Sequence, residues 1–95
     1  MNNIFAVTYF YDQARTEAVV AARPKHREFL RGLYAAGQLL ASGPTDDGNA
    51  LLIVRAEDAN GALALLDPDP MREAGVITDR NARGWNAVIG PWAEN

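Results

Sequence analysis

The chain contains no cysteine and one histidine, His26, in 95 residues. Without cysteine there can be no disulfide framework, thiolate metal site or thiol nucleophile. A single histidine also excludes a metal site built from a histidine cluster. The acidic turn that contains Asp46, Asp47 and Asn49 lacks the spacing and the distal glutamate of a calcium loop, and a hairpin explains it better. We therefore expect no bound metal.

Long apolar runs, nucleotide-binding motifs and an excess of basic residues are also absent. No apolar run approaches the ~20 residues needed to cross a bilayer, and the first residues lack the basic and apolar regions of a signal peptide. No glycine-rich phosphate loop, dinucleotide fingerprint or nucleophile elbow occurs, so no cofactor is expected. The formal net charge of −3 argues against a nucleic-acid partner. We expect a cytoplasmic protein that binds neither membranes nor nucleic acids.

The length of 95 residues predicts a single domain over positions 1–95. A chain this short buries a modest fraction of its surface on folding. Because 48% of its residues are nevertheless hydrophobic, additional burial by self-association is favoured. We expect a homodimer.

His26 lies within a helical pattern whose apolar side it shares. At about 100° per residue, Leu30 and Leu33 fall within about 40° of His26, so the imidazole points inward. A side chain that titrates near neutrality must there find a hydrogen-bond partner or line a cavity that holds one. The far side of this helix carries charged residues expected to face solvent: Arg27, Glu28 and Arg31.

Turn residues divide the chain into elements. Pro24 fits the first position of a helix, and Gly37 suits the left-handed residue that ends one. Asp69 followed by Pro70 has the chemistry of a capped helix start, which Gly75 would end. The predicted elements are a strand over 4–11, a turn or short helix within 12–22, a helix over 24–36, strands over 39–42 and 50–56, a helix following Asp58 to residue 66, a short helix from residue 70 and a last strand over 85–89.

The order strand, helix, strand, strand, helix, strand is typical of a ferredoxin-like α+β sandwich, also called a split βαβ fold. Both helices would cover one face of a four-stranded antiparallel sheet. The other face needs a cover, and two sheets packed face to face would supply it. This arrangement strengthens the expectation of a dimer.

The remaining chemistry is that of a histidine paired with a carboxylate. A carboxylate bonded to one ring nitrogen fixes the tautomer and leaves the other nitrogen to exchange a proton with a substrate. Asp69 is the best candidate carboxylate. Two alternatives stay open: Asp69 as a helix cap alone, and His26 as a hydrogen-bonded core residue. Sequence spacing does not place the two side chains together.

The chain resembles the YCII-related (YciI-like) family over essentially its whole length. The resemblance rests on the order and spacing of Arg23-Pro24-Lys25-His26, Leu30, Gly37, the segment 39–44, Asp69-Pro70, Ala74-Gly75 and Trp85. It implies a ferredoxin-like domain that pairs through its sheets into a dimeric α/β barrel. It also implies a pocket with a His-Asp pair suspected of catalysis, and the family's two residues fall on His26 and Asp69.

Members of the family with an assigned activity are lyases or dehydrochlorinases of chloroaromatic breakdown, and their fold is similar to that of muconolactone isomerases. This chain departs from the family pattern at two positions. Met71 replaces the usual phenylalanine after Asp-Pro, which reshapes a wall of the expected pocket. Gly84 replaces the proline that usually precedes the C-terminal tryptophan.

We therefore expect an acid/base enzyme of lyase, dehydrochlorinase or isomerase type that acts on a small organic molecule. His26 would act as general base or acid, and Asp69 would orient it. The residues expected to contact the substrate are Ser42, Gly43, Pro44 and Met71. One alternative is a non-catalytic module that binds a small metabolite. Another is a structural protein that acts through oligomerisation or a partner protein.

Overall fold

Strand β1 (Asn3–Tyr11) lies at the centre of a four-stranded antiparallel sheet. It pairs with β3 (Ala50–Ala56) on one side and with β4 (Ile77–Gly84) on the other. Strand β2 (Leu39–Pro44) pairs with β3, so the order across the sheet is β2-β3-β1-β4. The computed structural model describes residues 3–93. This sheet order confirms the ferredoxin-like α+β fold.

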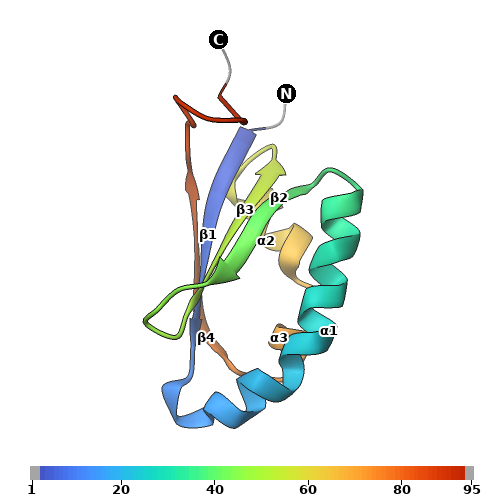
Figure 1. Cartoon of the computed structure of the whole chain (residues 1–95), viewed down its shortest axis with the longest axis vertical. Coiled ribbons are helices and arrows are strands. Elements are labelled where there is room, and N and C mark those ends of the chain that lie inside the picture. The colour runs from blue at the N-terminus through green and yellow to red at the C-terminus, as the bar shows by residue number, and fades with distance from the viewer. Residues whose placement is uncertain (1–2, 94–95) are drawn as a thin grey trace.

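The helices lie together on one side of the sheet (Figure 1). A 3₁₀ turn, η1 (Gln13–Arg15), leads into the long helix α1 (Thr16–Ala35). Helix α2 (Ala59–Leu66) and the short helix α3 (Pro70–Glu73) follow β3. Within the described part of the chain, every helix is too short or too polar to cross a membrane.

The core lies between the sheet and these helices. Alternate side chains of β1 point toward the helices, as strand geometry requires, and they are buried. The intervening side chains, among them Thr8 and Phe10, point to the opposite face, which no helix covers. The buried cluster combines Phe5, Val7, Tyr9, Tyr11, Leu52 and Val54 of the sheet with Val19, Leu30, Ala62, Leu66 and Met71 of the helices.

Helix α1 begins earlier than the sequence predicts. Pro24 was expected to start it, but the helix starts at Thr16 and Pro24 lies inside it. Proline lacks the N–H that would bond to the carbonyl of Val20, so the helix can continue through Pro24 only by bending. Figure 1 shows the first turns of α1 crossing the bottom of the view before the helix rises along the sheet. The expected boundary is therefore a bend.

The last strand also differs from the prediction. Residues 85–89 were expected to form it, whereas β4 is Ile77–Gly84. Strand β4 lies at the edge of the sheet, where polar residues are common, and it therefore lacks a strongly apolar pattern. Val88 and Ile89, which suggested a strand, are exposed.

Strand β2 continues through Gly43 and Pro44, beyond the predicted end at residue 42. Because β2 is the other edge of the sheet, a proline there need not donate a ladder hydrogen bond. The predicted helix ends are confirmed: Gly37 and Gly75 have positive φ angles of 79° and 70°. The caps are confirmed as well, since Asp58 accepts a hydrogen bond from the N–H of Gly61 at 2.7 Å.

Candidate functional site

His26 and Asp69 form a buried pair between α1 and the start of α3. The imidazole Nδ1 of His26 lies 2.9 Å from Oδ1 and 2.8 Å from Oδ2 of Asp69. His26 is 7% exposed and Asp69 is 0% exposed. The interaction is therefore shielded from water, where a hydrogen bond to a charged group is stronger than at the surface.

Asp69 is held in place by two further donors. The backbone N–H of Met71 donates to Oδ1 at 2.9 Å, which makes Asp69 the N-cap of α3, with Pro70 at the first helical position. The hydroxyl of Tyr9, on the central strand, donates to Oδ2 at 2.8 Å. The start of α3 and the central strand thus each hold one oxygen of the carboxylate that bonds to His26.

This geometry fixes the tautomer of the neutral imidazole. A carboxylate oxygen can only accept, so Nδ1 carries the hydrogen that is shared with Asp69. The other ring nitrogen, Nε2, forms no hydrogen bond with a described residue. Because every fully buried polar side-chain atom of the described residues has a hydrogen-bond partner, Nε2 is not fully buried. His26 lines a pocket, and with Nδ1 engaged by Asp69, Nε2 is the ring nitrogen left available there.

Two tyrosines beside the pair stay neutral at ordinary pH. Burial raises the pKa of Tyr9 well above its usual value, and the adjacent Asp69 carboxylate raises it further. Burial and Asp69 also raise the pKa of Tyr11 to about 12, although Arg23 opposes this shift. Tyr9 therefore donates to Asp69, while Tyr11, whose hydroxyl has no hydrogen-bond partner among the described residues, is one of the residues that line the pocket.

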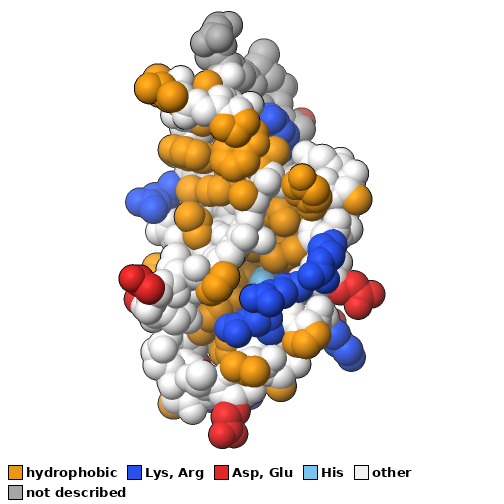
Figure 2. All heavy atoms as spheres, in the orientation of Figure 1, with side chains coloured by type: hydrophobic (Ala, Val, Ile, Leu, Met, Phe, Trp, Pro, Cys, Tyr) orange, Lys and Arg blue, Asp and Glu red, His pale blue; other side chains and the backbone are white. Residues whose placement is uncertain are grey.

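The pocket lies between α1 and the edge of the sheet formed by β2 and the start of β3. Its volume is about 410 Å³, within the range of small-molecule sites. Figure 2 looks onto this side of the molecule, and the pale blue histidine appears beside a band of blue side chains. The apolar lining is provided by Leu30 of α1, Leu39 of β2 and Leu52 of β3.

The structure brings four of the six residues expected at the site to the pocket wall, namely His26, Ser42, Gly43 and Pro44. Asp69 lies behind His26 and does not line the pocket. Met71, expected to contact the substrate, is fully buried in the core and is not part of the lining. Its contribution to the site is the backbone N–H that holds Asp69.

Sequence reasoning missed the arginines of α1. Arg27 and Arg31 were assigned to a solvated face, yet they line the pocket together with Arg23. The spacing of four residues was the available signal, because it places the three side chains on successive turns of the same edge. Side chains exposed at the mouth of the pocket can contact either solvent or a ligand. A helical-wheel projection of the sequence therefore could not tell a solvent-facing arginine from a ligand-binding one.

Comparisons with known proteins agree with this fold. The model of the YCII-related domain matches residues 4–86. No curated protein matches the chain. A solved structure, the 5-chloro-2-hydroxyhydroquinone dehydrochlorinase from Burkholderia phenoliruptrix AC1100 in complex with 2,5-dihydroxybenzoquinone, aligns with a TM-score of 0.75 and 20% identity, over 96% of this chain and 99% of that chain. At this identity the likeness establishes a shared fold.

Proposed function

Because the chain belongs to the YCII-related family, we propose that it is a small acid/base enzyme in which His26 moves a proton to or from an organic substrate without a cofactor. The observation that carries the proposal is the bond from Nδ1 of His26 to both oxygens of Asp69, which leaves Nε2 unbonded in a ring that lines the pocket. Such a pair is one arrangement that supports general acid/base catalysis.

The reaction class follows from these groups. Nε2 would take a proton from a carbon beside a carbonyl, and the electron pair of the broken C–H bond would move onto the carbonyl oxygen as an enolate. Asp69 stabilises the imidazolium that forms, and the neutral hydroxyl of Tyr11 is available to donate to the enolate oxygen. In an elimination, the enolate re-forms the carbonyl and the group on the next carbon leaves with its bonding electron pair, after which the imidazolium releases its proton to the leaving group or to water. In an isomerisation, Nε2 returns the proton to another carbon of the substrate.

The substrate would lie against the wall formed by β2. Ser42 offers a hydroxyl, and Gly43 and Pro44 shape the end of this wall. Met71 would act indirectly, through the N–H that holds Asp69. The similar dehydrochlorinase acts on a chlorinated hydroxyhydroquinone, a single-ring compound, and this supports a substrate of comparable size and a lyase or isomerase type of reaction.

We also propose that the protein works in the cytoplasm as a homodimer, joined through the face of the sheet that no helix covers. This face carries the partly exposed Phe10 and Leu51, which lie on adjacent strands. Replacing both with lysine should leave the helix-facing core intact and give a monomer in sedimentation equilibrium. A variant that still sediments as a dimer would rule this face out as the interface.

The test of the activity uses single-ring compounds with a proton beside a carbonyl, together with lactones, carboxylates and chlorinated phenols. Each is incubated in D₂O with wild-type protein or with His26→Ala, and carbon-bound deuterium is measured by NMR. We expect at least one compound to exchange or react with the wild type only. Ligands are first identified by the rise in melting temperature that binding produces.

A compound that stabilises the wild type but is never exchanged or converted would favour the alternative, a module that binds a small metabolite. The same proton transfer by wild type and His26→Ala would show that His26 does not perform it. Loss of the fold in His26→Ala is checked by circular dichroism, and His26→Gln provides a second variant that keeps a polar side chain.

A further inference from the structure

Arg23, Arg27 and Arg31 line one edge of the pocket and form what we call the arginine edge. They lie four residues apart on α1, so the edge extends over about 12 Å at 1.5 Å per residue. They represent three of the nine basic residues of a chain whose net charge is −3. A third of the basic side chains of this acidic protein thus line its pocket.

The arginine edge has no acidic partner in the described structure. The ion pairs found within residues 3–93 join His26 to Asp69, and Arg72 and Arg80 to Asp67. No aspartate or glutamate is part of the pocket lining. The three guanidinium groups are therefore free to pair with an anion that enters the pocket.

The three arginines of the arginine edge differ in burial along α1. Arg23 is partly buried, whereas Arg27 and Arg31 are exposed. Arg23 is also close enough to Tyr11 to favour the ionised form of its hydroxyl, so its charge reaches the end of the pocket where Tyr11 lies. The opposite wall is apolar, with Leu39 and Leu52. One side of the pocket thus suits a ring and the other suits a negative charge.

We infer that the arginine edge is an anion-binding subsite, and that the substrate is a small organic acid with one apolar ring and a carboxylate or similarly acidic group. The ring would pack against the leucines while the anionic group pairs with the guanidinium groups. This inference rests on the proposed function only in that both use the same pocket. An anion can bind there without any proton transfer.

The test compares benzoate with benzamide, which has the same ring and no charge. Binding is measured by NMR from the shifts of the His26 ring and of the Ser42 amide, at low ionic strength and at ~1 M salt, where the Debye length falls to about 3 Å. Benzoate should shift both signals more than benzamide does. High salt should reduce the benzoate effect and leave the benzamide effect nearly unchanged.

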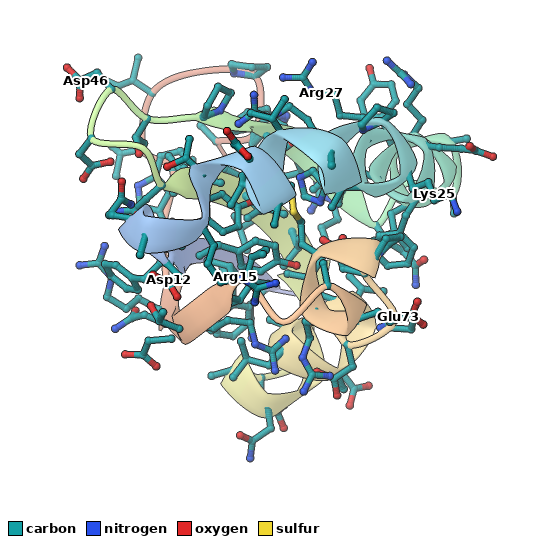
Figure 3. The ribbon with its side chains drawn as sticks, turned by 90° about the horizontal axis from the view of Figure 1, so that it is seen from below. Asp12, Arg15, Lys25, Arg27, Asp46 and Glu73 are labelled. Carbon is teal, nitrogen blue, oxygen red and sulfur yellow. The ribbon has the colours of Figure 1, made fainter. Side chains whose placement is uncertain are left out.

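The variants are Arg23→Gln, Arg27→Gln and Arg31→Gln, with Lys25→Gln as the matched control. Lys25 lies on the same helix and its replacement removes the same charge, but it does not line the pocket. Figure 3 shows Lys25 and Arg27 leaving α1 in different directions. We expect each arginine variant to weaken benzoate binding by about threefold to tenfold, and Lys25→Gln by less than about twofold.

The inference is overturned if benzamide binds as well as benzoate, if Lys25→Gln weakens benzoate as much as Arg27→Gln, or if benzoate shifts neither signal. His26→Ala separates this inference from the proposed function. Benzoate binding that persists in His26→Ala, reported by Ser42, supports the subsite whether or not any compound is turned over. Loss of benzoate binding in a folded His26→Ala would show that the arginine edge is not sufficient and would contradict the inference.

Discussion

Nδ1 of His26 lies within 2.9 Å of both carboxylate oxygens of Asp69, although 43 positions separate the two residues in the sequence. The contact joins the long helix α1 to the start of α3. Asp69 also accepts from Tyr9 of the central strand, so the elements α1, α3 and β1 meet at one carboxylate.

Asp69→Ala should destabilise the protein strongly. It removes the acceptor of the Tyr9 hydroxyl, the Met71 N–H and Nδ1 of His26, which are left buried without a partner. We expect the free energy of unfolding to fall by about 3–5 kcal/mol, measured by urea denaturation. Asp58→Ala is the matched control, because it removes an exposed cap and should cost about 1 kcal/mol. Equal losses of unfolding free energy in the two variants would indicate that Asp69 acts only as a helix cap.

Tyr9→Phe should show that Tyr9 supports Asp69. The variant keeps the ring in the core and removes only the donor to Oδ2. The expected loss is about 1–2 kcal/mol in urea denaturation. Tyr11→Phe serves as the control, since the hydroxyl of Tyr11 bonds to no described residue and its removal should cost less than about 0.5 kcal/mol. Similar losses in both variants would contradict a specific role for Tyr9.

The stability of the protein should fall as the pH rises above about 10. In the folded state burial raises the pKa of Tyr11 from 10.0 to about 12, and that of Tyr9 is raised as well. Above pH 10 the unfolded chain loses these protons while the folded chain keeps them, so the unfolded state is favoured by up to about 1.4 kcal/mol per pH unit for each tyrosine.

This contribution is fully present below pH 10 and is lost as the pH approaches the folded values. Urea denaturation at a series of pH values between about 8 and 11 measures it. Tyr11→Phe should show a shallower decline over the same range. A free energy of unfolding that stays constant up to pH 11 would show that the tyrosines are not shielded as described.

Met71 should act through packing. Because its side chain is fully buried and does not line the pocket, Met71→Ala should lower the free energy of unfolding by about 2–5 kcal/mol, and Met71→Leu by less than about 1.5 kcal/mol. Met71→Leu should leave benzoate binding unchanged, as measured by the same NMR titration. A change in benzoate affinity without a change in stability would indicate that Met71 contacts the ligand, as the sequence predicted.

Local patterns predicted much of the fold and failed where tertiary packing overrode them. Gly37 and Gly75 were located correctly because a positive φ angle is a local requirement. The predicted helix start at Pro24 was wrong, because proline can also lie inside a packed helix that bends at that point. The last strand was misplaced because the edge strand Ile77–Gly84 is polar, whereas the apolar residues after it remain outside the sheet.

The site depended on information that spacing does not contain. Helical periodicity placed His26 inward, and the Asp69-Pro70 pair indicated a helix cap, and both are confirmed. The contact between His26 and Asp69 depends on the packing of α1 against α3. Only the family resemblance predicted this contact. The arginine edge was missed because Arg27 and Arg31 are exposed at the mouth of the pocket, where a helical wheel assigns them to solvent.

The central claim is that Asp69 holds the proton of the neutral His26 ring on Nδ1 and leaves Nε2 free to act. Since the chain has one histidine, ¹H–¹⁵N correlation spectra of the imidazole report this ring without ambiguity. The neutral ring should show a protonated Nδ1 and an unprotonated Nε2 in the wild type, and Asp69→Asn should lose this preference. A proton on Nε2 of the wild-type ring, unchanged in Asp69→Asn, would contradict the account.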